Sequence, residues 1–354
     1  RRIARIAWPP PTRLALPCPR SIIPIDPRSR RWLASRTTSG TPKCSHSLLP
    51  PCSGPWTRNR CLRLVPKPNR RARPTPIRLR CGSLEVLIRD FVNEVAAPNR
   101  GRGIARWQGS ICVGVANLRA EPAQYIVDRV STVAEDVGLT PGQPGCEANV
   151  IIIATDQPDR IAGDLVRERR RAFRLGGTGM DRGNNELSAF ISSDQPVRWW
   201  QVSMPVDRDT GRRAIRLPGD CRGDCNGGPQ DFAPVIANPA GSRLSTPIVD
   251  NLFRTVVILD MTQVSGVSTE QLADYLAMIT LAQIDPTADT SRYATVLNVF
   301  ADPDSAPGLT DWDEAYLAGL YEAERTRKNA GAGRGEIAAS IRRAHQRLTT
   351  EDPD

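Results

Sequence analysis

Three carboxylates in the C-terminal half of the chain are the side chains best suited to acid–base chemistry. Asp260 lies at the end of the apolar segment 254–261, and Glu270 and Asp274 belong to the segment that follows it. Two carboxyl groups within about 10 Å of each other can serve as general acid and general base in a hydrolase. A carboxylate-dependent hydrolase is therefore one hypothesis, and it requires at least two of the three to share one open cleft.

Other catalytic and metal-binding arrangements are incomplete in this sequence. The chain contains only two histidines, His46 and His345, whereas zinc sites and serine-hydrolase triads commonly depend on imidazole. The triplet Asp209-Thr210-Gly211 matches the catalytic triplet of aspartic peptidases, but charged neighbours on both sides predict an exposed turn. Apart from the carboxylate hypothesis, we expect no catalytic residue, no metal site and no cofactor.

The adjacent tryptophans Trp199 and Trp200 are candidate binding residues. They lie in the segment 197–206, which we predict to be a strand. Successive side chains of a strand point to opposite faces of a sheet, so the two indoles should occupy different faces. We expect one indole in the core. We expect the other nearer the surface, either as an ordinary side chain or as the wall of a groove for a ligand or partner.

Four cysteines beyond the N-terminal segment, Cys112, Cys146, Cys221 and Cys225, are spaced to form two disulfides. Cys112 begins the first expected strand and Cys146 precedes the second. Neighbouring strands lie about 4.8 Å apart, and a disulfide requires Cα atoms about 4.4–6.8 Å apart. Cys221 and Cys225 flank three residues of a glycine-rich loop. Two such pairs favour an oxidising compartment, the periplasm or the extracellular space. Free thiols in a cytoplasmic protein and a metal site are the alternatives.

The segments that position these residues alternate between helix and strand patterns. Apolar residues recur three and four positions apart in 84–96, and helices are also expected at 123–137 and 158–173. Apolar runs at 111–118 and 149–154 predict strands, the second of them buried on both faces. A strand–helix–strand order predicts that these two strands are parallel, with a right-handed crossover.

The second half of the chain contains further strands and the longest predicted helix. Segments 187–192 and 197–206 are strand candidates in an otherwise irregular middle, and 254–261 is a second fully buried strand. The segment 267–284 has the strongest helical pattern.

Two capping boxes mark the starts of C-terminal helices. Ser268 with Gln271 fits this motif at the start of the long helix, and Thr310 with Asp313 fits it before the helix 311–325.

These elements predict an α+β fold, in which a mixed sheet combines an N-terminal βαβα unit with C-terminal helices. We expect a single domain at residues 82–330, followed by a polar C-terminal helix and tail at 331–354.

Residues 1–81 differ from both, with 17 Arg, 15 Pro and one acidic residue, Asp26. A segment so rich in proline and charge cannot bury a core, so we predict that it is disordered.

Three interpretations of residues 1–81 stay open. The segment is an arginine-rich arm that binds nucleic acid or an anionic membrane surface, a solvated linker, or the translation of a non-native reading frame. The third is suggested by an initial Arg, a first methionine at Met180, and 45 Arg against 3 Lys. The start of the chain shows no secretory signal, so an exported protein would have its signal peptide missing here.

Two segments, 256–283 (VVILDMTQVSGVSTEQLADYLAMITLAQ) and 309–321 (LTDWDEAYLAGLY), resemble a family of uncharacterised alphaproteobacterial proteins. That family is in turn distantly similar to a domain of unknown function with a zincin-like fold. In active zinc peptidases the corresponding helix carries His-Glu-x-x-His. Here it reads Ala273-Asp274-Tyr275-Leu276-Ala277-Met278, without a histidine. The resemblance thus implies a degenerate zincin-like scaffold that has lost its metal and its peptidase activity.

Taken together, the sequence favours a non-enzymatic, exported protein with a binding or envelope-associated role. Its expected partner is a protein or an envelope component, and no transmembrane segment is expected because no run approaches about 20 apolar residues. One alternative is a carboxylate-dependent hydrolase related to zincin-like peptidases. The other is nucleic-acid binding through residues 1–81, which we expect less.

Overall fold

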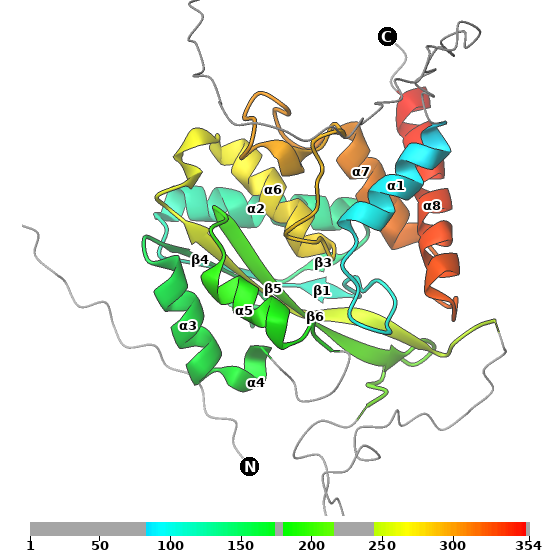
Figure 1. Ribbon diagram of the computed structural model, residues 1–354, viewed down its shortest axis with the longest axis horizontal. Coiled ribbons are helices and arrows are strands. Elements are labelled where there is room, and N and C mark those ends of the chain that lie inside the picture. Colours follow the sequence, from blue (N-terminus) through cyan, green and yellow to red (C-terminus); the bar gives the residue numbers. More distant parts are fainter. Residues whose placement is uncertain (1–82, 174–179, 216–243, 352–354) are drawn as a thin grey trace, which may run out of the picture. The chain divides into compact units, whose positions relative to one another are not determined.

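The computed structural model describes residues 83–173, 180–215 and 244–351. The chain divides into two units, Arg1–Thr75 and Pro76–Asp354, and all described residues belong to the second. The predictions for residues 1–81, for Cys221 and for Cys225 therefore lie outside the described residues. The second unit has an α+β fold with a mixed sheet, which confirms the predicted fold class (Figure 1).

A four-stranded sheet forms the centre of this unit. Its strands lie in the order β2 (Val113–Ala116), β4 (Val150–Thr155), β6 (Ile248–Asp260) and β5 (Val197–Asp207). The first three are parallel, which confirms the predicted pairing of β2 with β4, and β5 runs antiparallel to β6. A second, two-stranded parallel sheet consists of β1 (Ser110–Ile111) and β3 (Thr140–Pro141).

Different helices cover the two faces of the sheet (Figure 1). One face packs against α2 (Ala120–Asp136) and α6 (Thr269–Leu281), and the other against α3 (Pro158–Glu168), α4 (Arg170–Phe173) and α5 (Asn184–Ser192). Alternation along β6 divides its side chains between two cores. Val257 and Leu259 belong to the core on the α6 side, while Val256 and Ile258 belong to the core on the α5 side. This alternation is the expected property of an extended strand buried on both faces.

A group of three helices lies beside α6, formed by α1 (Leu84–Val95), α7 (Asp311–Glu322) and α8 (Ala330–Glu351). The helix α8 was expected to be a polar element outside the domain. It instead contributes Ile337, Ile341 and Ala344 to the main core. Their spacing of four and three residues gives an otherwise polar helix one narrow apolar stripe, and that stripe makes α8 part of the domain.

Several local predictions are tested by the structure. Both capping boxes are confirmed, at Ser268 of α6 and at Thr310 of α7. The prediction of a strand at 187–192 is wrong, because these residues form the end of α5. A short apolar run cannot by itself distinguish a strand from a buried turn of helix. Among the described helices, none combines the length and apolar character needed to cross a membrane.

The predicted disulfide between Cys112 and Cys146 is present, with Cα atoms 6.1 Å apart. Cys112 directly precedes β2 and Cys146 lies shortly before β4, so both cysteines lie at the edge of the sheet where the parallel strands begin. The pairing therefore follows from the parallel arrangement of these strands. The Asp209-Thr210-Gly211 triplet lies in an exposed turn after β5, as predicted.

Candidate functional site

Trp199 and Trp200 lie side by side on β5, opposite Val257 and Val256 of β6. Trp199 belongs to the core on the α6 side and Trp200 to the core on the α5 side, as strand alternation predicts. Both side chains are buried, so neither is an ordinary surface residue. Each indole N–H donates to a backbone carbonyl, from Trp199 to Ile284 at 3.1 Å and from Trp200 to Phe173 at 2.8 Å.

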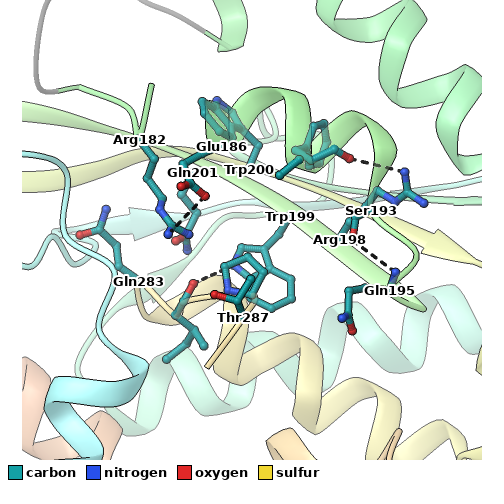
Figure 2. A pocket seen from close by; sticks show the side chains of 14 residues that line it. Arg182, Glu186, Ser193, Gln195, Arg198, Trp199, Trp200, Gln201, Gln283 and Thr287 are labelled. Atoms are coloured by element: carbon teal, nitrogen blue, oxygen red, sulfur yellow. Dashed lines mark hydrogen bonds and ion pairs between the residues drawn. The ribbon is translucent and has the colours of Figure 1, made fainter. Parts of the chain in front are cut away.

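A cleft of about 110 Å³ opens beside these residues, where β5 meets α5 and the segment after α6 (Figure 2). A neighbouring cleft of about 220 Å³ shares part of its lining, including Trp199, Ile284 and Pro286. We call the two together the Trp199 cleft. Aromatic and apolar side chains form much of its wall, notably those of Phe190, Trp199, Ile284, Pro286, Tyr275 and Phe300.

Two glutamines in the wall of the Trp199 cleft have fixed orientations. The Gln201 amide nitrogen donates to the carbonyls of Ile279 at 3.0 Å and Ala282 at 2.8 Å. The Gln283 side-chain oxygen accepts from the backbone N–H of Ala105 at 2.7 Å. Among the described residues, no group donates to Gln201 Oε1 and none accepts from Gln283 Nε2. Backbone groups thus hold the Gln201 amide by its nitrogen, so its oxygen can still accept a hydrogen bond. They hold the Gln283 amide by its oxygen, so its nitrogen can still donate one.

The charges at the Trp199 cleft are largely compensated. Arg182 pairs with Asp285 at 3.0 Å and with Glu186 at 3.4 Å, and Figure 2 shows Arg182 directed at Glu186. Arg198 pairs with Asp159 at 2.7 Å and also donates to the carbonyl of Ile191 at 2.8 Å. These pairs leave no large excess of either sign beside the aromatic wall.

A separate, open cleft lies at the carboxyl ends of β4 and β6. Its wall contains Asp156, Asp159, Asp194 and Asp260, together with Arg198. In open α/β sheets this edge is a frequent location for ligands. Among the described residues, however, no group of three or more His, Cys, Asp or Glu side chains is arranged to hold a metal ion.

Asp260 is held by the turn that follows β6. Its carboxylate accepts from Thr262 through the backbone N–H at 2.9 Å and the hydroxyl at 2.6 Å, and from the Gln263 amide at 2.7 Å. Desolvation alone would raise the pKa of Asp260, but these hydrogen bonds outweigh it and lower the pKa below its ordinary value. Asp260 therefore stays ionised near neutral pH, which suits a turn-stabilising carboxylate better than a general acid.

The other two predicted carboxylates lie elsewhere. Asp274 of α6 is buried, forms an ion pair with Arg129 of α2, and accepts from the backbone N–H of Leu309 at 2.8 Å. Glu270 is exposed in the first turn of α6. Of the three, only Asp260 lines one of the clefts described above. The hydrolase hypothesis requires two of these three carboxylates in one cleft. The described clefts do not contain such a pair.

Trp199 and Trp200 are the candidate binding residues that the sequence predicts, whereas Gln201, Gln283 and Arg182 line the same cleft and are not among the predicted residues. A signal existed for the glutamines, because each is a polar residue at a position where the apolar pattern predicts a buried side chain. Arg182 gives no such signal, since it lies within the irregular middle of the chain.

Comparison with protein-family models, curated proteins and solved structures found no family, protein or structure that matches this chain.

Proposed function

We propose that this is a binding protein of an oxidising compartment, and that the Trp199 cleft recognises an uncharged ligand carrying an amide group. One observation carries the proposal: Gln201 and Gln283 are each held by the backbone on one side, which leaves an acceptor and a donor beside an aromatic wall. An amide offers the complementary donor and acceptor. An apolar substituent on the ligand would then contact the aromatic and apolar wall that contains Trp199.

The fixed glutamines favour recognition because their orientation is set before a ligand arrives. Ordering a free side chain on binding costs about 0.5–1.5 kcal/mol, and part of this cost is avoided when backbone partners already hold the amide. A bound amide would also satisfy polar atoms that otherwise depend on water. A ligand lacking the amide would leave these atoms without partners, which disfavours its binding.

The charges around the cleft support an uncharged ligand. Arg182 already interacts with two carboxylates, Asp285 and Glu186. A charged ligand would have to compete with these ion pairs. An uncharged amide does not.

The disulfide between Cys112 and Cys146 supports an oxidising compartment, such as the periplasm or the extracellular space. An envelope-associated role of this kind agrees with the function expected from the sequence.

Isothermal titration calorimetry of the full chain with N-acetyl-leucinamide and related capped amino-acid amides tests the proposal. We expect saturable binding to the amide and about tenfold weaker binding to methyl 2-acetoxy-4-methylpentanoate, the ester analogue in which oxygen replaces both amide nitrogens, so that no amide N–H remains. Failure of every capped amide to bind, or equal binding of amide and ester, would contradict the proposal.

The Gln283→Glu variant provides a sharper test. Glutamate retains an oxygen that can accept from the Ala105 N–H, but replaces the unused donor by an acceptor. We expect amide binding to weaken about tenfold, as for loss of one hydrogen bond of about 1.4 kcal/mol. Gln124→Leu is the control, because Gln124 is exposed on α2 and bonds to Asp128. Thermal unfolding of each variant establishes that it is folded.

A further inference from the structure

A second cleft, distinct from the Trp199 cleft, contains a concentration of positive charge. It encloses about 510 Å³, between the segment after α1, the start of β6 and the first turns of α8. Five cations line it, against two acids, Asp250 and Glu324; the cations are Arg102, Arg325, Arg327, Lys328 and Arg334. None of its lining residues belongs to the Trp199 cleft. We call it the cationic cleft.

Most of these cations are not neutralised within the protein. Arg327 pairs with Glu336 at 3.5 Å, and Arg102 lies 3.9 Å from Asp250. In the described part of the chain, Arg325, Lys328 and Arg334 form no ion pair with a carboxylate. Clefts lined by one sign of charge concentrate ligands of the opposite sign.

Arg325 is the best-fixed cation of the cleft. Its guanidinium donates to the Asp250 carbonyl at 3.0 Å, to Asn251 Oδ1 at 2.8 Å and to Gln108 Oε1 at 3.3 Å. All three acceptors are neutral, and the Asp250 carboxylate acts on the guanidinium electrostatically without forming an ion pair with it. Burial, together with the nearby Arg106, lowers the pKa of Arg325 to about 10, so the side chain remains charged at neutral pH. A partly buried charge of this kind is stabilised by an opposite charge.

The start of α8 adds to the positive potential. Ala330, Gly333 and Arg334 line the cleft from the first turns of this 22-residue helix. A helix N-terminus carries a partial positive charge from its aligned peptide dipoles. The Asn329 side chain caps the helix by accepting from the N–H of Gly331 at 2.8 Å and of Ala332 at 3.1 Å, so α8 contributes this dipole and the Arg334 side chain to the cleft. A Cβ atom added at Gly333 would meet no neighbour, so there is free space at this point of the wall.

Asp250 gives the cleft an unusual acceptor. One carboxylate oxygen accepts from the backbone N–H of Gly103 at 3.3 Å. The other, Oδ1, is buried, lies 3.9 Å from Nε of Arg102 and accepts no hydrogen bond from the described residues. An ionised carboxylate with so few donors is costly to bury. A ligand that is negatively charged overall but still carries a proton would match both the cations and this carboxylate.

We propose that the cationic cleft binds a hydrogen phosphate group, with Arg325 and Arg334 facing its negative oxygens and Asp250 accepting its proton. At neutral pH inorganic phosphate retains a proton, whereas sulfate has none. The carboxylate of Asp250 therefore favours phosphate and repels sulfate. This site is independent of the Trp199 cleft and of the function proposed for it.

Calorimetric titration of the full chain with sodium phosphate and with sodium sulfate, at low ionic strength, tests this site. We expect phosphate to bind and sulfate to bind at least about tenfold more weakly. Equal binding of the two anions, or no binding of phosphate, would overturn the proposal. Vesicles of phosphatidylglycerol form a further arm: their phosphodiesters carry no proton at neutral pH, so binding that is stronger to vesicles than to free phosphate would also overturn it.

Variants then locate the site. Arg334→Gln and, separately, Lys328→Gln should each weaken phosphate binding several-fold, because each removes a cation that forms no ion pair in the described structure. Arg342→Gln is the control: this residue lies further along α8, pairs with Glu85 at 3.8 Å and does not line the cleft. Unchanged affinity in both cleft variants would refute the assignment.

Asp250→Asn tests the selectivity separately. Its amide can donate to sulfate, so the preference for phosphate over sulfate should disappear. If the Asp250→Asn variant still preferred phosphate over sulfate, Asp250 would not be the residue that distinguishes the two anions by the proton on phosphate. None of these variants should change the binding of capped amides, so failure at the cationic cleft is distinguishable from failure at the Trp199 cleft.

Discussion

Gly319 of α7 lies directly against the backbone of Ile341 in α8. A Cβ atom at position 319 would overlap both the backbone nitrogen and the Cα atom of Ile341. The two helices can approach this closely only because the residue at 319 has no side chain. This contact is what brings the apolar stripe of α8 into the main core.

Gly319→Ala should therefore destabilise the protein by about 2 kcal/mol, because the two helices must separate to accommodate the methyl group. Chemical denaturation measures this change. Gly335→Ala is a matched control on α8, since a Cβ atom there meets no neighbour; it should leave stability unchanged or raise it by up to about 1 kcal/mol. A Gly319→Ala protein as stable as the wild type would contradict the close packing of α7 on α8.

Asp274 has a structural role in connecting α6, α2 and the segment before α7. Replacement by Asn removes the charge that pairs with Arg129 and should cost about 2 kcal/mol of unfolding free energy. The pair also raises the pKa of Arg129, chiefly through the hydrogen bond to Asp274. Asp128→Asn, which alters an exposed carboxylate on α2, should change stability by less than about 0.5 kcal/mol. Equal effects of the two substitutions would argue against this role.

The disulfide between Cys112 and Cys146 closes a segment in which the two cysteines are 34 positions apart. Constraining a loop of this length in the unfolded chain stabilises the fold by about 3–4 kcal/mol. The double variant Cys112→Ser/Cys146→Ser should lose stability of this order in urea denaturation. Peptide mapping of the unreduced protein should recover the two cysteines linked. Recovery of both as free thiols would remove the argument for an oxidising compartment.

The ionisation of Asp250 should make stability depend on pH. Burial raises the pKa of this carboxyl, although Arg102, the Gly103 N–H and Arg325 each favour its charged form. The folded protein then binds the proton more tightly than the unfolded chain, whose Asp titrates at about pH 3.9. The contribution of Asp250 to stability consequently falls as the pH rises from that value through the folded-state pKa.

Asp250→Asn removes this ionisation, so its stability relative to the wild type should increase between about pH 4 and pH 7. Urea midpoints measured for both proteins at the two pH values test the expectation. A difference that stays constant with pH would mean that Asp250 titrates alike in the folded and unfolded states.

Local patterns in the sequence were sufficient where neighbouring residues determine the structure. The capping boxes at Ser268 and Thr310 depend on side chains three residues apart. Two other features are also visible in short stretches of sequence. One is the apolar run that forms β4, and the other is the position of Cys112 and Cys146 just before two parallel strands. Even here a short run misled, since residues 187–192 form part of α5 and not a strand. The apolar content of that segment is compatible with either structure, and only packing against Trp200 and the neighbouring helices decides between them.

The two clefts were decided by tertiary structure alone. Gln201 and Gln283 gain their orientation from backbone groups of Ala282 and Ala105, which lie about 80 and 180 positions away along the chain. The cationic cleft brings Arg102, Asp250 and Arg325 together from three distant segments. A sequence specifies that such residues are charged or polar. Whether they become neighbours, and whether each finds a partner, depends on how the sheet and its helices pack.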